Sequence, residues 1–418
     1  MPSAISASTS TAQGPRGSRN ENTAWRRLQC GGAAILGLLL GGCSLLPTLP
    51  RPTAPASAPA PATGAAAPSP AASAPSPTAS SPAAAAPGLA RLVPLRVADL
   101  PGWAGDDLAE AWAAWLRSCA SSALRAKPAY ARACAVAAAV APVPAARRAY
   151  FEQQFDAFAV QASDGQASGL LTGYYEPLLR GSRTRSARFN VPLYARPDDL
   201  QATPLGDLTR SRRTAHGPAP YWTRAQIDQG LAAHSLRGRE IVYVDSAVEA
   251  LFLQIQGSGR VQLQDGPERG HTLRLAYADH NGQPYRSVGQ WLVQQGALRA
   301  DEASMQGIKA WAARNPGRVA QMLAANPRYV FFREESANAD GPRGALNVPL
   351  TAGRSVAVDP RAVELGAPVW LDSTEPLSDR PLRRLAMAQD VGGAITGAVR
   401  ADLFWGSGDE AGDLAGRT

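Results

Sequence analysis

Two aspartates, Asp390 and Asp402, stand at the ends of apolar stretches that a glycine-rich segment joins. A carboxyl group among apolar side chains loses hydration of its charged form, so its pKa rises and it can serve as a general acid. Gly392 and Gly393 have no side chains and allow a bulky substrate to approach the backbone. A turn-capping or arginine-pairing role for each aspartate is the simpler interpretation of this segment alone.

The motif Gly173–Pro177 adds two adjacent aromatic residues, Tyr174 and Tyr175, at the end of a predicted strand. Neighbouring side chains of a strand point to opposite faces, so one tyrosine can pack in the core while the other faces a cleft. Tyrosine rings stack on sugars, although core packing of both rings is an equal alternative. Glu176 is either an additional carboxylate or a turn residue before Pro177.

Residues 253–259 read Leu-Gln-Ile-Gln-Gly-Ser-Gly and alternate with a period of two. This pattern predicts a strand with Gln254 and Gln256 on one face, followed by a bend at Ser258. Amide and hydroxyl groups are suitable hydrogen-bonding partners for sugar hydroxyl and N-acetyl groups. The polar face of an ordinary antiparallel sheet is the alternative interpretation.

The pair Asn281-Gly282 predicts a hairpin turn, with Asp279 and His280 at its tip and a return strand after it. None of the four histidines has metal-ligand spacing to another, and the chain has no Gly-x-Ser-x-Gly motif and no evident free cysteine for nucleophilic catalysis. These observations disfavour acyl transfer and metal-dependent hydrolysis. We therefore expect no metal site and no cofactor.

The N-terminus predicts export. Four arginines precede an apolar run at 33–40, which ends at Gly41-Gly42-Cys43. This is typical of a lipoprotein signal peptide over residues 1–42, with Cys43 as the lipidation site. Residues 43–88 are rich in Ala, Pro and Ser and predict a disordered tether. Since Ser44 follows the cysteine, we expect an outer-membrane lipoprotein that faces the periplasm, with an uncleaved anchor as the alternative.

The formal net charge is +8, of which the signal peptide contributes +3, so the mature chain has about +5. The arginines are spread along the chain and no nucleic-acid motif accompanies them. We expect compatibility with an anionic polymer or a membrane surface and no nucleic-acid partner, while solubility alone also explains the charge.

The cysteines Cys119 and Cys134 lie in two Ala-rich helical stretches, Leu108–Ser122 and Ala129–Ala141. A helical hairpin would bring them together, and an oxidising compartment favours a disulfide.

After a third helix that ends near Phe158, the pattern changes to short, turn-bounded apolar stretches, so the rest is mostly β, as in a barrel or sandwich. The predicted strands are 167–174, 191–195, 240–244, 250–255, 259–263, 273–278, 330–333, 355–358, 368–371, 382–389 and 398–404. The predicted helices in this part are 223–234, 288–295, 305–315 and 318–326.

Asp359, Asp390 and Asp402 each follow or end a predicted β element and could gather at one end of a barrel. Together with the motifs at 173–177, 254–259 and 276–289, they resemble the membrane-bound lytic murein transglycosylase A family over essentially the whole mature folded chain. The resemblance implies a double-psi β-barrel domain formed by residues 89–180 and 277–418, with its three-aspartate region at about 344–416. It also implies a β-rich domain inserted at 181–276 and a glycan groove between the two domains.

The same resemblance implies cleavage of the β-1,4 bond between N-acetylmuramic acid and N-acetylglucosamine, which leaves a 1,6-anhydromuramoyl end. Asp402 matches the catalytic aspartate, and Asp390 and Asp359 match supporting ones. The expected groove contacts are Tyr174, Tyr175, Gln254, Gln256, Ser258 and Asn281. Expected partners are peptidoglycan strands, the outer membrane through the lipid anchor, and murein synthases or scaffolds. A hydrolase in which Asp390 or Glu176 assists Asp402 and a non-catalytic wall-binding module are the alternatives.

Overall fold

The computed structural model describes residues 90–206, 208–336, 340–376 and 378–418. The predicted signal peptide, Cys43 and the predicted tether lie outside the described residues. Within the described ranges, no helix has the length and apolar character needed to cross a membrane.

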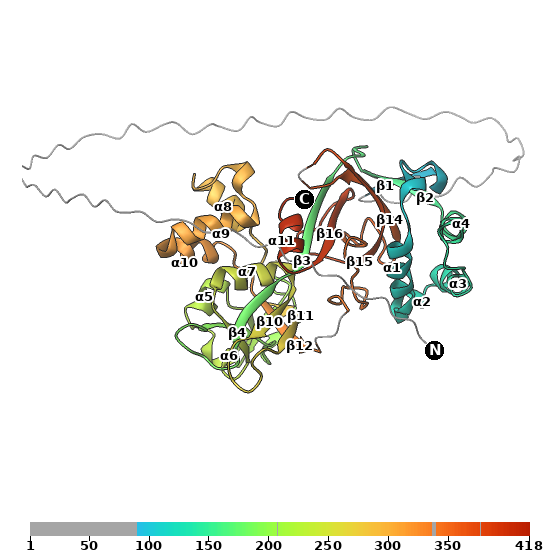
Figure 1. The fold of residues 1–418 in the computed structure, drawn as a ribbon. Helices are drawn as coiled ribbons and strands as arrows, with labels where there is room; N and C mark the ends of the chain where they lie inside the picture. Colours follow the sequence, from blue (N-terminus) through green and yellow to red (C-terminus); the bar gives the residue numbers. More distant parts are fainter. Residues whose placement is uncertain (1–89, 207, 337–339, 377) are drawn as a thin grey trace, which may run out of the picture. The chain divides into compact units, whose positions relative to one another are not determined.

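The first described part contains short helices and a two-stranded antiparallel sheet (Figure 1). Its elements are β1 (Ala90–Leu95), two 3₁₀ helices (Val97–Asp99 and Trp103–Gly105), α1 (Ala109–Ala120), α2 (Ser122–Arg125), α3 (Pro128–Ala137), α4 (Pro144–Gln154) and β2 (Ala157–Ala162). We predicted that the third long helix ends near Phe158, but α4 ends at Gln154, because Ala157 already pairs with Leu95 of β1.

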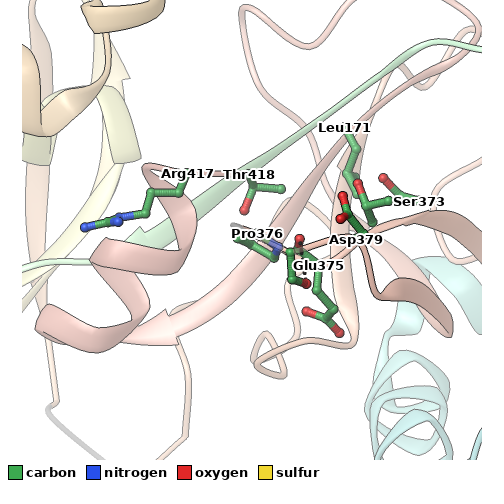
Figure 2. A pocket seen from close by; sticks show the side chains of 9 residues that line it. Leu171, Ser373, Glu375, Pro376, Asp379, Arg417 and Thr418 are labelled. Carbon is green, nitrogen blue, oxygen red and sulfur yellow. Dashed lines mark hydrogen bonds between the residues drawn. The ribbon is translucent and has the colours of Figure 1, made fainter.

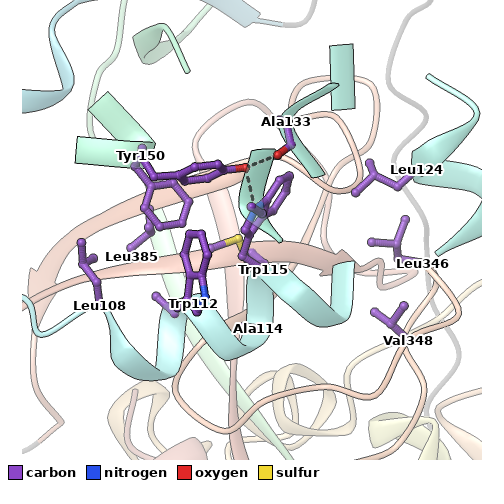
Figure 3. Packing of buried hydrophobic residues seen from close by; sticks show 14 of the residues in the cluster. Leu108, Trp112, Ala114, Trp115, Leu124, Ala133, Tyr150, Leu346, Val348 and Leu385 are labelled. Carbon is purple, nitrogen blue, oxygen red and sulfur yellow. Dashed lines mark hydrogen bonds between the residues drawn. The ribbon is translucent and has the colours of Figure 1, made fainter. Parts of the chain in front are cut away.

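An aromatic core holds these helices together (Figure 3). Trp112 of α1 meets Tyr150 of α4 edge-on, with ring centroids 4.9 Å apart. Trp115 Nε1 donates to the Tyr150 hydroxyl (2.9 Å), which donates to the carbonyl of Ala133 (2.8 Å), so the polar atoms of these two rings are satisfied. Leu385 from the C-terminal part of the chain belongs to the same core.

Cys119 of α1 and Cys134 of α3 form a disulfide, with their Cα atoms 5.5 Å apart. The short helix α2 connects α1 and α3, so the expected helical hairpin is present and brings the two cysteines together.

A five-stranded sheet of order β14-β15-β13-β16-β3 follows the helices. Its strands are β3 (Leu170–Glu176), β13 (Ser355–Val358), β14 (Pro368–Thr374), β15 (Pro381–Asp390) and β16 (Arg400–Ser407). β13 lies parallel to β15 and antiparallel to β16, and β16 lies parallel to β3. The sheet therefore combines the end of the chain with a strand from its first half.

A six-stranded sheet of order β12-β11-β10-β4-β9-β5 forms the second β unit. Its strands are β4 (Leu178–Ser182), β5 (Val191–Tyr194), β9 (Glu240–Val244), β10 (Ser258–Leu263), β11 (Thr272–His280) and β12 (Val330–Glu335), and a separate three-stranded sheet contains β6 (Leu200–Gln201), β7 (Ser211–Thr214) and β8 (Gly217–Pro220). The predicted boundary at 276/277 falls within β11, whose partner is β12. We infer that the inserted unit extends from Leu178 to Glu335.

The helices of the remaining chain are α5 (Arg224–Asp228), α6 (Ala233–Leu236), α7 (Ala247–Gln256), α8 (Val288–Gln294), the 3₁₀ helix Ala300–Glu302, α9 (Met305–Arg314), the 3₁₀ helix Pro316–Arg318, α10 (Val319–Ala324) and α11 (Asp409–Ala415). The predicted helix 223–234 is divided into α5 and α6, because Gly230 adopts a φ of +79° between them.

The predicted strand at 250–255 is wrong, since these residues form most of helix α7. Ser246 caps the helix by accepting a hydrogen bond from the Glu249 backbone N–H. Leu253 packs into the core of the six-stranded sheet, whereas Leu251 packs against the helices α8–α10. A helix buried on two sides lacks a clean polar stripe, so its sequence does not show the helical period.

Candidate active site

The strand register brings Asp390 and Asp402 to one face of the five-stranded sheet. Ala357 of β13 is the cross-strand partner of Asp402 on one side and of Asp390 on the other. Cross-strand partners point to the same face, and strands lie ~4.8 Å apart, so the Cα atoms of the two aspartates are separated by about 10 Å. The two carboxyl groups are therefore neighbours with one strand between them.

A β-bulge aims Asp390 at this face. The register between β13 and β15 shifts after Val356, which pairs with Ala388, so that Ala357 pairs with Asp390 and skips Gln389. Gln389 is fully buried, and its amide donates to the Ala114 carbonyl and to the Ser118 hydroxyl of α1. The N-terminal helices thus hold the bulge, which sets the direction of the next side chain.

The carboxyl of Asp402 is held by Thr172, which the sequence analysis did not select, and Thr172 is in turn held by Arg400, which the sequence suggested only as a partner for an aspartate in a structural role. The Thr172 hydroxyl donates to Asp402 Oδ1 (2.7 Å), and Arg400 Nη2 donates to Thr172 Oγ1 (2.8 Å). Burial raises the pKa of Asp402, while the Thr172 hydrogen bond and the Arg400 charge oppose this increase. The alternation of side chains along a strand could have identified both residues. Thr172 lies two positions before Tyr174 in β3, and Arg400 lies two positions before Asp402 in β16, so each shares a face with that residue.

Asp390 accepts three hydrogen bonds. Its Oδ1 accepts from the backbone N–H groups of Ala345 and Val391 (both 2.9 Å), and its Oδ2 accepts from the Tyr174 hydroxyl (3.0 Å). Burial nevertheless raises the pKa of Asp390 to about 6, and the charge of Asp402 adds to this shift. The pKa of Tyr174 is also raised, first by burial and then by the two aspartates.

The tyrosine pair divides between two faces, as the alternation predicts. Tyr174 reaches Asp390, and its ring lies 5.2 Å from that of Phe404. Tyr175 is 5% exposed and packs against Ala411 and Ala415 of α11. Tyr174 therefore lies at the aspartate face, whereas the predicted groove contact of Tyr175 is corrected to a position in the core.

Glu176 is fully buried and has no freedom to assist Asp402. Its Oε2 accepts from Arg260 Nε (2.7 Å) and from the Ser407 hydroxyl (2.7 Å), and its Oε1 accepts from Arg274 Nε (2.9 Å). These bonds link β3 and β16 to β10 and β11 of the other sheet. Glu176 is therefore a structural residue, and a hydrolase that uses it as the second carboxylate is excluded.

The third aspartate, Asp359, stabilises the segment between Asp390 and Asp402. It is 2% exposed, pairs with Arg361 Nη2 (2.7 Å), and accepts from the Gly397 backbone N–H (2.9 Å). The Arg361 hydrogen bond holds the pKa of Asp359 well below its usual range. Because Gly397 adopts a φ of +113°, this contact fixes a turn just before β16.

Two of the predicted substrate-binding amides are buried and bonded to the protein. Gln254 is 5% exposed and accepts from Arg224 Nη2. Asn281 is fully buried and donates from Nδ2 to the carbonyls of Trp222 and Pro327 (both 2.8 Å). Asn281 thus does not sit at a hairpin tip, since β11 pairs with β12 and no strand follows directly. The predicted glycan contacts of Gln254 and Asn281 are therefore corrected, since both side chains hold neighbouring protein segments in position.

Gln256 and Ser258 are partly buried at the junction between α7 and β10. Gln256 Oε1 accepts from the Tyr175 backbone N–H (3.1 Å), while Ser258 pairs in register with Ala276. Their contact with a glycan stays a prediction.

Figure 2 shows a cavity of about 420 Å³, and neither Asp390 nor Asp402 is among the residues that line it. Ser373, Glu375, Asp379 and Arg417 are among the residues that line it, and none of the predicted site residues does. In the described ranges of the chain, no group of three or more His, Cys, Asp or Glu side chains could hold a metal ion. The two carboxyl groups with raised pKa values, Asp390 and Asp402, are the groups of this site that could take part in acid–base chemistry.

Comparisons with known proteins agree with this architecture. A family model for the MltA-specific insert domain matches residues 170–333, and a model for the 3D domain matches residues 354–418. The Escherichia coli K12 membrane-bound lytic murein transglycosylase A is 30% identical over 268 residues, which cover 62% of this chain and 66% of that protein.

Two solved structures extend the comparison. MltA from Neisseria gonorrhoeae is 36% identical with a TM-score of 0.68, covering 80% of this chain and 91% of that one. E. coli MltA with bound chitohexaose is 27% identical with a TM-score of 0.58, covering 78% and 88%. The fold is a double-psi β-barrel domain with an inserted β-rich unit. The chain belongs to the MltA family.

Proposed function

We propose that the protein is a lytic transglycosylase that cleaves the β-1,4 bond between N-acetylmuramic acid and N-acetylglucosamine in peptidoglycan. The observation that carries the proposal is the partly buried Asp402, whose pKa is raised and whose Oδ1 accepts from Thr172. The relatives named lytic murein transglycosylase A and the relative solved with chitohexaose support a glycan substrate.

In the proposed reaction Asp402 acts first as an acid. With Oδ1 accepting from Thr172, Oδ2 carries the proton and gives it to the glycosidic oxygen, so the bond from C1 to the leaving sugar breaks. The carboxylate then takes the proton of the C6 hydroxyl of the muramoyl sugar, and O6 bonds to C1. Asp402 is protonated again, and the product has a 1,6-anhydro ring.

One catalytic carboxyl is sufficient because the nucleophile belongs to the substrate and is held at high effective concentration. Asp390 supports the protonated state of Asp402 by like-charge repulsion once Asp390 is ionised. Its two oxygens already accept three protein hydrogen bonds, which leaves it poorly placed to activate a water.

The second candidate is a hydrolase in which Asp390 is the base, since both aspartates share one face of the sheet. The Asp402→Asn and Asp390→Asn variants separate the candidates when sacculi are digested and the products are analysed by mass spectrometry. A transglycosylase gives anhydro ends that Asp402→Asn abolishes and Asp390→Asn reduces less. Reducing ends would establish the hydrolase, and binding without soluble products would indicate a wall-binding module.

We further propose that the domain is attached through a lipid on Cys43 to the outer membrane and faces the periplasm, with murein synthases or scaffolds as partners. The membrane-bound naming of the relatives supports membrane association. Labelling with a radioactive fatty acid tests the anchor, which Cys43→Ala should eliminate.

A further inference from the structure

Arg328 of the inserted unit lies directly against the segment that follows Asp390. It occupies the loop between α10 and β12. A Cβ atom placed on Gly393 would lie 2.4 Å from Arg328 Nη1 and 3.6 Å from its Cζ, so the guanidinium rests on the backbone of Gly393. Gly393 is three positions after Asp390, so this positive charge contacts the segment that follows a residue of the candidate active site.

Hydrogen bonds from buried side chains hold the loop that carries Arg328 in place. Arg224 Nη2 donates to the Arg328 carbonyl (2.8 Å), and the Arg328 backbone N–H donates to Asn326 Oδ1 (3.2 Å). Gln254 in turn accepts from Arg224, and Asn281 donates to the carbonyl of Pro327. The buried amides that resembled sugar-binding groups therefore position the arginine, which lowers the entropic cost of ordering it around a ligand.

The end of the Arg328 side chain has unused donors. Nε donates to the Gln283 carbonyl (3.0 Å), while Nη1 and Nη2 have no hydrogen-bond or ion-pair partner within the described part of the chain. A guanidinium with two free Nη groups can bind a carboxylate with paired, charge-assisted hydrogen bonds.

The charges around Arg328 are also unbalanced. Arg196 and Arg210 both pair with the single carboxylate of Asp279. These three residues and Arg328 together have a net charge of +2. Burial and the neighbouring Arg210 lower the pKa of Arg328, and Tyr277, which is 42% exposed, also lies close to both arginines. An anion at Arg328 would relieve this repulsion, and the ring of Tyr277 offers a surface for a sugar.

We propose that Arg328 binds a carboxylate of the substrate beside Gly393, so that the site selects an anionic glycan over an uncharged one. This inference rests on the proposed function and specifies its substrate. In peptidoglycan the carboxylate comes from the lactyl group of a muramic acid that has lost its peptide, or from the peptide itself, because an attached peptide occupies the lactyl carboxyl as an amide. Chitohexaose has neither.

The experiment measures affinity by calorimetry in an Asp402→Asn background, which prevents turnover. The ligands are chitohexaose, glycan strands stripped of peptides, and strands that retain their peptides. Adding Arg328→Gln should weaken binding of the anionic strands about tenfold and change the affinity for chitohexaose less than about twofold. Adding Arg237→Gln, which changes an exposed arginine without a side-chain partner in the described residues, should leave all three affinities unchanged.

A loss of affinity for the stripped strands identifies the lactyl carboxylate as the group that Arg328 binds. A loss of affinity only for the peptide-bearing strands identifies a carboxylate of the peptide. An equal loss for all three ligands, or no loss for any, overturns the proposal. Gly393→Ala gives a second test, because its Cβ displaces the guanidinium. Gly393→Ala should cause the same selective loss of affinity for the anionic strands. Combining it with Arg328→Gln should cause no further loss. Failure of the proposed function is detected separately, because the wild-type protein would then release reducing ends or no soluble products from sacculi.

Discussion

Replacing Asp390 by Asn should make the stability of the protein less dependent on pH. The ordinary pKa of an aspartate is 3.8, and burial raises that of folded Asp390 to about 6. Between these values the unfolded chain releases the proton while the folded chain retains it, so the wild-type protein loses stability as the pH rises through this window. Asn cannot ionise and still accepts the Ala345 and Val391 N–H bonds.

The expected magnitude follows from the shift of about 2 pH units at ~1.36 kcal/mol per unit, or at most about 3 kcal/mol. Asp390 is only partly buried, and water screens part of this effect, so we expect ~1–3 kcal/mol. The free energy of unfolding of Asp390→Asn relative to wild type should therefore increase by this amount between pH 4 and pH 7. Urea unfolding followed by tryptophan fluorescence at several pH values measures it.

Asp359→Asn is the matched control with the opposite sign. The pKa of Asp359 is lowered by its pairing with Arg361, so Asp359 contributes stability above its ordinary pKa that is lost as the pH falls. The Asp359→Asn variant should be less stable than wild type at pH 7, and the difference should shrink in acid. If the Asp390→Asn difference is constant with pH or has the same slope as the control, the assignment of a desolvated carboxyl at Asp390 is refuted.

Three further predictions concern residues around the site and in the scaffold. Thr172→Val removes the hydrogen bond to Asp402, so the pKa of Asp402 should rise further. The kcat should fall roughly tenfold, and the alkaline limb of the pH–rate profile should move to higher pH. An unshifted pH–rate profile would contradict the contact between Thr172 and Asp402. Glu176→Gln removes the carboxylate shared by Arg260 and Arg274 and should destabilise the protein by about 3 kcal/mol in urea unfolding, while Asp301→Asn, in an exposed pair with Arg299, should cost under ~0.5 kcal/mol. Replacing Cys119 and Cys134 by Ser opens a loop with a sequence separation of 15 and should cost about 3 kcal/mol, and a reducing agent should then have no further effect.

Local pattern was sufficient for most of the β elements. β9 and β13 have the predicted bounds, and β10 begins one residue before its predicted start, because short apolar stretches between Gly, Pro and Asn are strongly marked. Helix α7 is not predicted, because its local pattern is not marked in this way. Leu251 and Leu253 face two different cores, so burial on two sides removed the polar stripe that marks a helix.

The residues around Asp402 show a similar division. Tyr174 was predicted because aromatic side chains are conspicuous, whereas Thr172 and Arg400 are ordinary residue types in a strand. Their importance comes from the pairing of β3 with β16, which are far apart in the sequence. The amide of Gln254 is predicted to bind a sugar, but in the structure its oxygen accepts from Arg224 of the protein itself.

The sequence by itself determined the mainly β character of the chain, the candidate carboxyls Asp390 and Asp402, and the opposite faces of Tyr174 and Tyr175, because these depend on residue type and on a period of two. Only the tertiary structure decided that a bulge at Gln389 turns Asp390 towards the face of Asp402, and that Arg328 of the inserted unit lies on Gly393. Register between distant strands and contacts between two units depend on packing of the whole chain, which no local pattern encodes.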